Sequence, residues 1–349
     1  MNSPAQEPLV IKPYLETLLR GADLDEAAAA AVMAAVVEGR LPAPSMAAFL
    51  TALRAKGETE HELAAFAAVL RAHARRVQAP EGTVDTCGTG GDSSGTFNIS
   101  TAAALVAAGM GIPVAKHGNR SVSSASGSAD VLKALGVNID APLLIVEKCL
   151  REAGIAFLFA PALHPGMKHA APVRRELGIR TVFNLLGPLS NPAFAKRQVL
   201  GVYEPRLCAL FARVLAQLGS TDALVVCGAG AGGTGHLDEV STFGPSLIAR
   251  LRNGEVLEEE FIPASLGLAT PDAEALAVDG PEKSAATIRA VLSGQAGPAR
   301  DVVVLNAAAA AQVAGLAGDW KSGMDLAAAS IDSGKALRAL ERLAALSAA

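Results

Sequence analysis

Cysteines are scarce in this chain, and no two of them have the spacing of a metal-binding motif. The 349 residues include only four, which lie far apart: Cys87, Cys149, Cys208 and Cys227. This distribution excludes a disulfide-stabilised scaffold and a cysteine-rich zinc site. It favours reduced thiols in a cytoplasmic protein.

Long apolar runs and an excess of basic charge are also lacking. The longest apolar stretches, such as 101–112, are short and interrupted by glycine, which argues against a membrane span. The first 20 residues lack the basic and apolar regions of a secretory signal. The formal net charge of −4 argues against binding to nucleic acid. An anionic ligand would therefore need a local basic pocket.

Apolar residues at helical spacing dominate residues 8–78. The pattern predicts four helices, with Asp23, Ser45 and Thr59 as N-caps: Pro8–Arg20, Asp23–Glu38, Ser45–Lys56 and Thr59–Val77. Residues 78–82 break the pattern, and a domain boundary is expected there.

After this boundary, short β-branched runs alternate with helical patterns. Strands are predicted at 83–86, 113–116, 156–159, 198–202, 223–227 and 302–305. Helices are predicted at 101–109, 129–135, 143–153, 206–218 and, as one or two closing helices, 326–345. Such alternation is typical of an α/β domain with a mostly parallel central sheet. The alanine cluster 307–311 predicts a tightly packed helix.

A long polar loop follows the first predicted strand. It begins with Gly88-Thr89-Gly90-Gly91-Asp92 and ends at Asn98-Ile99-Ser100-Thr101, where a helix is predicted. Glycine allows close approach of the backbone, and free N–H groups at a helix start favour a bound anion. The pentapeptide alone is equally typical of a tight turn. The length of the loop and its hydroxyl and amide groups favour phosphate binding.

A basic segment at the end of the second predicted strand is the strongest single signal. It reads Lys116-His117-Gly118-Asn119-Arg120-Ser121-Val122-Ser123-Ser124, and a second helix start follows at Gly127-Ser128. A solvated polar loop is a poor explanation, because the flanking segments are apolar. Two anion-binding helix starts separated by a basic strand end predict a ligand with phosphate at both ends.

An acidic pair, Asp238-Glu239, follows the glycine-rich segment 228–233. On a loop, both carboxylates can reach one Mg²⁺ ion, although a solvent-exposed pair is the commoner explanation of such a dipeptide. The segment 228–233 matches G-x-G-x-x-G, but no amphipathic helix follows, which excludes a dinucleotide fingerprint.

Single charged side chains are harder to interpret. Arg174 is able to bind a carboxylate through two of its guanidinium nitrogens at once. His164 and His169 have no partner pattern that predicts a ligand site, and a place in the core or on the surface is favoured for each.

Together these motifs resemble anthranilate phosphoribosyltransferases. The resemblance rests on GTGGD at 88–92, NIST at 98–101, KHGNRSVSS at 116–124, GSADVLKALG at 127–136 and RTVFNLLGPLSNP at 180–192. LDE at 237–239 and LNAA at 305–308 extend it, so that it covers nearly the whole chain in order. Two segments depart from the family pattern: 228–236 is longer and richer in glycine, and 276–281 is less rich in glycine.

The resemblance implies a reaction of tryptophan biosynthesis. The phosphoribosyl group of 5-phosphoribosyl-1-pyrophosphate (PRPP) passes to the amino group of anthranilate, and pyrophosphate is released. It also implies a small helical domain over residues 1–78, joined by helices around 167–187, and an α/β catalytic domain over 79–349, in the nucleoside phosphorylase/phosphoribosyltransferase-like fold class. A cytoplasmic homodimer formed through the helical domains is expected, with no nucleic-acid or membrane partner.

The family's binding residues are carried over by position. PRPP is expected at Gly88, Gly91, Asp92, Thr96, Asn98, Ile99, Ser100, Thr101, Lys116, His117, Gly118, Asn119, Arg120, Ser121, Val122, Ser123, Ser124 and Ser128. Anthranilate is expected at Gly88, Asn119 and Arg174, and Mg²⁺ at Ser100, Asp238 and Glu239.

The chemistry of this reaction agrees with the motifs. Catalysis requires stabilisation of the charge that develops on pyrophosphate, by Mg²⁺ and Lys116. The aniline nitrogen is neutral at pH 7, so no catalytic nucleophile or general base is expected. Two alternatives share the fold: a pyrimidine nucleoside phosphorylase, which uses inorganic phosphate and does not need the acidic pair, and a non-catalytic nucleic-acid-binding relative.

Overall fold

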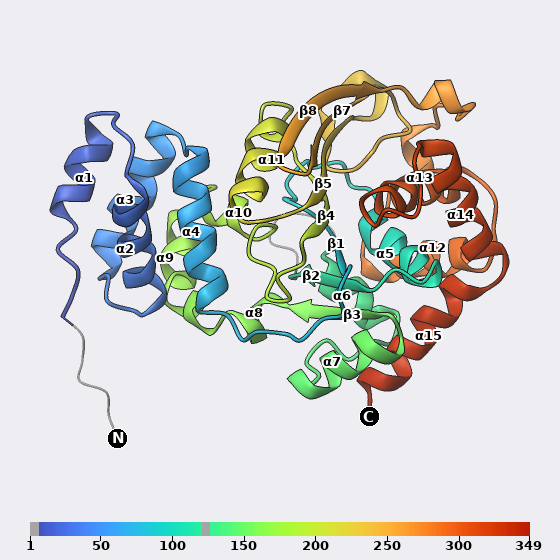
Figure 1. The fold of residues 1–349 in the computed structure, drawn as a ribbon, viewed down its shortest axis with the longest axis horizontal. Helices are drawn as coiled ribbons and strands as arrows, with labels where there is room; N and C mark the ends of the chain where they lie inside the picture. Colours follow the sequence, from blue (N-terminus) through green and yellow to red (C-terminus); the bar gives the residue numbers. More distant parts are fainter. Residues whose placement is uncertain (1–6, 121–125) are drawn as a thin grey trace. The chain divides into compact units, whose positions relative to one another are not determined.

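A computed structural model describes residues 7–120 and 126–349, which form two compact units (Figure 1). Of the described residues, the first unit comprises 7–76 and Pro161–Pro192, and the second comprises 77–120, 126–160 and Ala193–Ala349. Within the described residues, no helix is both long and apolar enough to cross a membrane.

The first unit is helical. Its described helices are α1 (Lys12–Leu19), α2 (Glu26–Val37), α3 (Ala43–Lys56), α4 (Glu60–Ala72), η1 (Pro165–His169), α9 (Ala171–Leu177) and α10 (Phe183–Leu186), with α8 (Ala160–Leu163) at its border. Thr59 caps α4 as predicted, in a capping box with Glu62. The other two predicted caps are wrong. Asp25, not Asp23, accepts the Ala28 N–H, and α3 begins before Ser45 because Pro44 suits the first turn of a helix.

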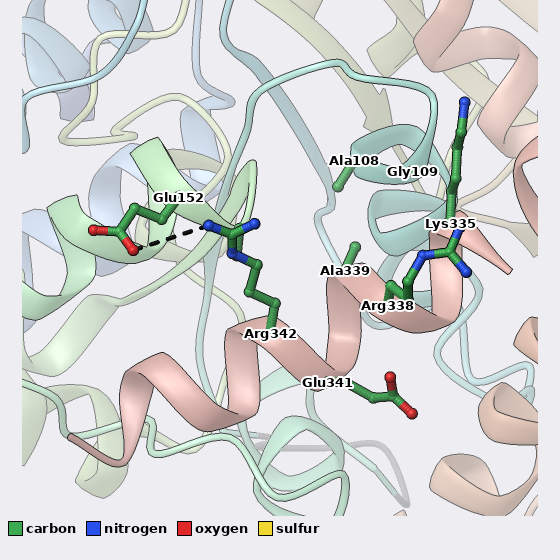
Figure 2. Close-up of a pocket in the computed structure, with 9 residues that line it drawn as sticks. Ala108, Gly109, Glu152, Lys335, Arg338, Ala339, Glu341 and Arg342 are labelled. Carbon is green, nitrogen blue, oxygen red and sulfur yellow. Dashed lines mark ion pairs between the residues drawn. The ribbon is translucent and has the colours of Figure 1, made fainter.

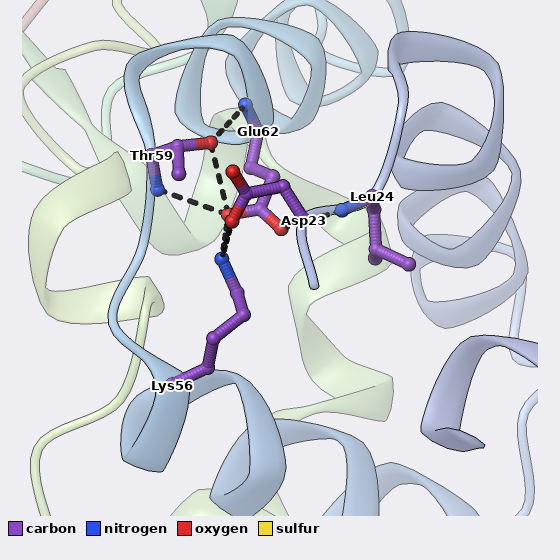
Figure 3. A network of polar contacts seen from close by, with 5 residues as sticks. All are labelled: Asp23, Leu24, Lys56, Thr59 and Glu62. Carbon is purple, nitrogen blue, oxygen red and sulfur yellow. Dashed lines mark hydrogen bonds and ion pairs between the residues drawn. The ribbon is translucent and has the colours of Figure 1, made fainter. Parts of the chain in front are cut away.

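Buried charges join three helices of this unit (Figure 3). The Glu62 side chain is fully buried; its Oε1 accepts the Leu24 N–H at 3.0 Å, and its Oε2 accepts the Thr59 N–H at 2.9 Å. The Lys56 Nζ lies 2.9 Å from Glu62 Oε2 and 2.6 Å from Asp23 Oδ1. The carboxylate therefore connects the start of α2, the end of α3 and the start of α4.

His164 lies in the core of the helical unit, which is one of the two locations predicted for it. Burial lowers its pKa to about 4, against a hydrogen bond with the Ser190 backbone that opposes the shift. The ring of His169 packs against the backbone of Gly39.

Acidification should therefore destabilise the helical unit through His164. In the unfolded chain His164 takes up a proton near pH 6.5, and in the folded chain only near pH 4. The free energy of unfolding is therefore highest above pH 6.5 and falls as the pH decreases below that value. The expected loss at pH 5 is about 2 kcal/mol, from about 1.4 kcal/mol per pKa unit. Urea unfolding at pH 7 and pH 5 measures it. The change in unfolding free energy from pH 7 to pH 5 should differ from that of the wild type by about 2 kcal/mol in His164→Gln and not at all in His169→Gln, a comparison that cancels the titration of other groups. A change equal to that of the wild type in His164→Gln would contradict the assignment.

The second unit is built on a mostly parallel sheet with strand order β3-β2-β1-β4-β5-β7-β8, and β6 pairs with β5. The first five strands of this order run parallel, and β6, β7 and β8 are antiparallel to their neighbours. The strands are β1 (Val84–Gly88), β2 (Val114–Gly118), β3 (Ile155–Phe159), β4 (Arg197–Gly201), β5 (Asp222–Ala229), β6 (His236–Leu237), β7 (Ser246–Arg252) and β8 (Glu255–Phe261). The predicted fold class is confirmed.

Helices cover both faces of this sheet. Figure 1 shows α11 on one side of the central strands and α5 and α13 on the other. The described helices are α5 (Ile99–Gly109), α6 (Ser128–Ala134), α7 (Leu143–Glu152), α11 (Leu207–Gln217), α12 (Pro281–Leu292), α13 (Pro298–Val313), α14 (Trp320–Asp332) and α15 (Lys335–Ser347), with short turns η2 (Ala231–Gly233), η3 (Pro263–Leu266) and η4 (Ala273–Ala275).

One prediction about this unit is wrong, and one feature of it is missing from the predictions. Residues 302–305 belong to α13 and not to a strand; they are buried, and a short buried apolar run has no periodicity that separates helix from strand. The hairpin β7–β8 was not predicted. Its two-residue turn, Asn253-Gly254, has positive φ at both residues (51° and 87°), which is the conformation that an Asn-Gly pair favours. The packed alanine helix at 307–311 is confirmed within α13.

Candidate functional site

The predicted binding motifs of the second unit converge at the carboxyl edge of its parallel strands. β1 ends at Gly88, β2 at Gly118 and β4 at Gly201, and Gly88 and Gly201 are direct neighbours in register. β2 continues two residues beyond the predicted strand 113–116, so His117 is a strand residue as well as Lys116. Ligands of open α/β sheets bind at this edge.

The first loop owes its path to residues with positive φ. Gly90, Gly91 and Gly95 have φ of 67°, 80° and 67°, and Ser93 has 58°. Within the loop, the Asp92 carboxylate accepts the Ser94 N–H at 3.3 Å. The hydroxyls of Ser94 and Thr96 lie 3.1 Å apart, next to Gly95. The loop therefore carries hydroxyl and amide groups that are able to bind phosphate, in a backbone conformation that glycine permits.

The start of α5 differs from the expectation of free N–H groups. The Ser100 N–H donates to Glu239 Oε1 at 2.9 Å, and the Thr101 N–H donates to the Asn98 carbonyl at 3.1 Å. Ile99 and Thr101 are buried. In this structure the carboxylate of Glu239 occupies the position at the helix start that favours an anion.

Lys116 is the buried cation of the site. Its side chain donates to the Thr86 carbonyl at 2.6 Å and to the Ser100 hydroxyl at 3.2 Å. Burial lowers the pKa of the ammonium group, and the charge of Asp85 on β1 opposes this shift. The backbone N–H of His117 donates to Asp85 Oδ1 at 3.2 Å. Asp85, which sequence reasoning missed, therefore holds the end of β2 in place from the neighbouring strand β1.

The rest of the basic segment approaches the start of α6. The Asn119 carbonyl accepts from the Ala129 N–H at 3.2 Å and from the Ser128 hydroxyl at 3.3 Å. The Arg120 guanidinium lies 3.7 Å from the Asp130 carboxylate and 5.8 Å from the centre of the Phe159 ring. Four predicted residues lie outside the described part of the chain: Ser121, Val122, Ser123 and Ser124.

The acidic pair packs onto these loops, so the interpretation as an isolated surface pair is wrong. The Gly90 N–H donates to Asp238 Oδ2 at 2.7 Å, and Glu239 accepts from Ser100 as described above. A side chain at Gly88 or Gly201 would collide with Asp238, and one at Gly228 would come within 2.6 Å of the Glu239 carbonyl. Glycine at three strand ends is a sequence signal that sequence reasoning did not use.

Both carboxylates of this pair resist ionisation. Burial, reinforced by the charge of Asp92, raises the pKa of Asp238 to about 7. Burial and the neighbouring Asp238 raise the pKa of Glu239 to about 8, against the opposing charge of Lys116. Two half-buried carboxylates and the hydroxyl of Ser100 are hard oxygen donors, which suit Mg²⁺. Among the described residues, no group of three or more His, Cys, Asp or Glu side chains converges as a metal cluster.

Arg174 lies in the helical unit, on α9. Its guanidinium stands 5.2 Å from the centre of the Phe183 ring, and burial lowers its pKa. α9 ends at Leu177, and the next residue, Gly178, has the left-handed conformation of a helix C-cap. The guanidinium is thus held against an aromatic ring instead of extending into solvent.

A separate pocket of about 590 Å³ lies at the opposite end of α5 (Figure 2). Its charged side chains are exposed, of both signs, and partly paired: the Arg342 guanidinium lies 4.0 Å from Glu152. None of the residues predicted from the sequence lines it. Its lining residues are Ala108, Gly109, Glu152, Ala153, Lys335, Arg338, Ala339, Glu341 and Arg342.

Comparison with known proteins agrees with this geometry. Residues 12–74 match a glycosyl transferase family helical bundle domain, and residues 80–337 match a glycosyl transferase family a/b domain. The chain is 50% identical to the anthranilate phosphoribosyltransferase of Pelotomaculum thermopropionicum over 335 residues, which cover 96% of each chain. This chain belongs to the anthranilate phosphoribosyltransferase family.

Solved structures of this family have the same fold. The anthranilate phosphoribosyltransferase of Thermus thermophilus superposes with a TM-score of 0.88 at 42% identity, covering 96% of this chain and 99% of that one. The Saccharomyces cerevisiae enzyme in complex with PRPP and Mg superposes with a TM-score of 0.86 at 30% identity, covering 97% of this chain and 98% of that one. The resemblance predicted from the motifs is confirmed, and the nucleoside phosphorylase alternative is not favoured. The chain is a phosphoribosyltransferase of tryptophan biosynthesis.

Proposed function

We propose that the carboxyl edge of the parallel sheet binds PRPP and directs its ribosyl carbon toward the amino group of anthranilate. One observation carries this proposal: a buried lysine, two polar loops and an acidic pair from distant parts of the chain meet at one edge. The yeast relative whose structure contains PRPP and Mg supports it.

The PRPP contacts are assigned to the two loops and helix starts. They comprise Gly88, Gly91, Asp92, Thr96, Asn98 to Thr101, Lys116 to Arg120 and Ser128, with Ser121 to Ser124 as further candidates. Lys116 would contribute most to charge stabilisation, because its ammonium group is buried and close to the start of α5.

The metal site is assigned to Asp238, Glu239 and the Ser100 hydroxyl. Bound there, Mg²⁺ would neutralise negative charge on the pyrophosphate group as the bond to the ribose breaks. Glycine at the ends of β1, β4 and β5 gives the acidic segment room to approach the loops. The side chains themselves need to supply only position and charge, since a neutral aromatic amine attacks without a base.

Anthranilate is assigned to Gly88, Asn119 and Arg174, and the guanidinium of Arg174 would bind its carboxylate. We also propose that the helical unit supplies the surface of a homodimer, and that the enzyme is cytoplasmic. The four buried free cysteines support a reducing compartment.

Replacement of Arg174 by alanine should impair anthranilate binding selectively. Loss of a charge-assisted pair predicts a rise in the KM for anthranilate of about tenfold to a hundredfold, with the KM for PRPP changed by less than about twofold. Steady-state kinetics with each substrate varied in turn measure both constants. Arg175→Ala on the same helix is the matched control, and equal effects of Arg174→Ala on the two constants would remove the assignment.

The activity itself is tested by the fluorescence of anthranilate. The signal should fall on addition of PRPP and Mg²⁺, and should stay constant when either is omitted. Turnover of a pyrimidine nucleoside with inorganic phosphate in place of these substrates would instead support the nucleoside phosphorylase alternative.

A further inference from the structure

Asn98 does not behave as an ordinary helix N-cap. Asparagine at this position usually accepts a hydrogen bond from the first turn of its own helix, but the Asn98 side chain makes no such bond. Its Nδ2 donates to the Ser126 carbonyl at 3.1 Å, and its Oδ1 accepts from the Ser126 hydroxyl at 2.7 Å. One amide thus connects the end of the first loop to the residue two positions before α6.

A third element fixes this amide. Ser284 lies on α12, is fully buried, and is separated from Asn98 by 186 residues. Its hydroxyl donates to Asn98 Oδ1 at 2.9 Å and accepts from the Asn98 backbone N–H at 3.0 Å. The hydroxyl therefore holds both the side chain and the backbone of the residue that begins α5.

The segment before α12 supports the same loop from the outside. The Phe97 N–H donates to the Leu276 carbonyl, and the Val278 N–H donates to the Gly95 carbonyl, each at 2.9 Å. Thr96 and Ala277 form an antiparallel bridge between these bonds. Residues 276–278 and Ser284 together position residues 95–98 of the loop. This segment overlaps 276–281, where the sequence departs from the family pattern.

We propose that Ser284 is a positioning residue for PRPP binding. It orients the Asn98 amide, and the amide in turn keeps the first loop and the start of α6 at the positions from which both contact PRPP. The inference rests on the proposed function of these loops. Without the Ser284 hydroxyl, the half-buried Asn98 amide is held by Ser126 alone, and the Asn98 backbone N–H loses its partner at the helix start. PRPP then has to fix the orientation of this amide as it binds, and this cost lowers its affinity.

The test compares Ser284→Ala with Ser330→Ala. Ser330 is also a buried serine, and its hydroxyl donates to the Val106 carbonyl at 2.9 Å near the other end of α5, so its loss perturbs the same helix without touching Asn98. Ser284→Ala should raise the KM for PRPP about tenfold, with the KM for anthranilate within about twofold of wild type. Ser330→Ala should leave both constants unchanged. Ser284→Cys, nearly isosteric and a weak donor, should lie between wild type and Ser284→Ala and keeps the test open if the alanine variant fails to fold.

A double-mutant cycle with Asn98→Ala separates this inference from the proposed function. If Ser284 acts through the Asn98 side chain, Ser284→Ala should raise the KM for PRPP by a smaller factor in Asn98→Ala than in the wild type, because only its bond to the Asn98 backbone N–H is left to lose. A raised KM in Asn98→Ala with an unchanged KM in Ser284→Ala would overturn the role of Ser284 alone. An unchanged KM in Asn98→Ala would overturn the PRPP assignment of Asn98, and the inference with it. Equal effects of Ser284→Ala and Ser330→Ala would reduce Ser284 to a structural residue.

Discussion

Joint replacement of Asp238 by asparagine and Glu239 by glutamine is expected to inactivate the enzyme and to make it more stable. Activity should fall by at least about a hundredfold, because the neutral amides cannot hold the cation that offsets the charge of pyrophosphate. Stability above pH 8 should rise, because the neutral amides do not bear the cost of ionising two carboxyl groups whose pKa values the folded protein raises.

The sign of the stability change follows from the raised pKa values. The folded protein binds protons on Asp238 and Glu239 up to about pH 7 and pH 8, whereas the unfolded chain releases them near pH 4. The wild type is therefore destabilised progressively as the pH rises through this window. The advantage of the amide variant should be small at pH 4 and largest above pH 8.

Thermal unfolding at these two pH values, with and without Mg²⁺, measures the effect independently of turnover. Mg²⁺ should raise the Tm of the wild type and leave that of the amide variant unchanged. The control is Glu259→Gln with Glu260→Gln on β8, which makes the same change in net charge on exposed side chains. A Mg²⁺-dependent shift that survives in the Asp238/Glu239 variant would rule out this pair as the metal ligands.

Glu62→Ala is expected to have the largest effect on the stability of the helical unit. It removes a fully buried carboxylate that accepts from the backbone N–H groups of Leu24 and Thr59 and from the Lys56 ammonium. Breaking a buried ion pair from one side typically costs about 3–5 kcal/mol. Lys56, whose side chain is only 5% exposed, would retain the single partner Asp23.

Urea unfolding followed by far-ultraviolet circular dichroism measures this loss. Glu38→Ala is the matched control, because Glu38 pairs with Arg40 at 2.6 Å on the surface of the same unit and should cost less than about 1 kcal/mol. Similar costs for the two variants would show that the network around Glu62 contributes no more than a surface ion pair.

The candidate site could be located from the sequence because most of its residues follow strands. The polar residues after 83–86 and 113–116 stand at the ends of adjacent parallel strands, and parallel strands bring their carboxyl ends to one edge. The capping box at Thr59 was equally predictable, because it depends on residues three positions apart.

Contacts between distant segments could not be predicted from local patterns. Asp238 is separated from Gly90 by 148 residues and Ser284 from Asn98 by 186, so no spacing in the sequence indicates either pair. For the same reason the occupation of the α5 start by Glu239 escaped prediction. The assignment of 302–305 failed differently, because burial on all sides removes the periodicity that distinguishes a helix from a strand.

The strand β8 affects whether two molecules of this protein can associate by pairing their strands. It lies at one end of the sheet order and carries exposed Glu255, Glu258, Glu259 and Glu260. An unpaired strand edge is a template for adding a strand from another molecule, and like charges along it oppose that addition. Uncontrolled growth by sheet extension, the first step toward aggregation, is thereby discouraged on this side of the molecule.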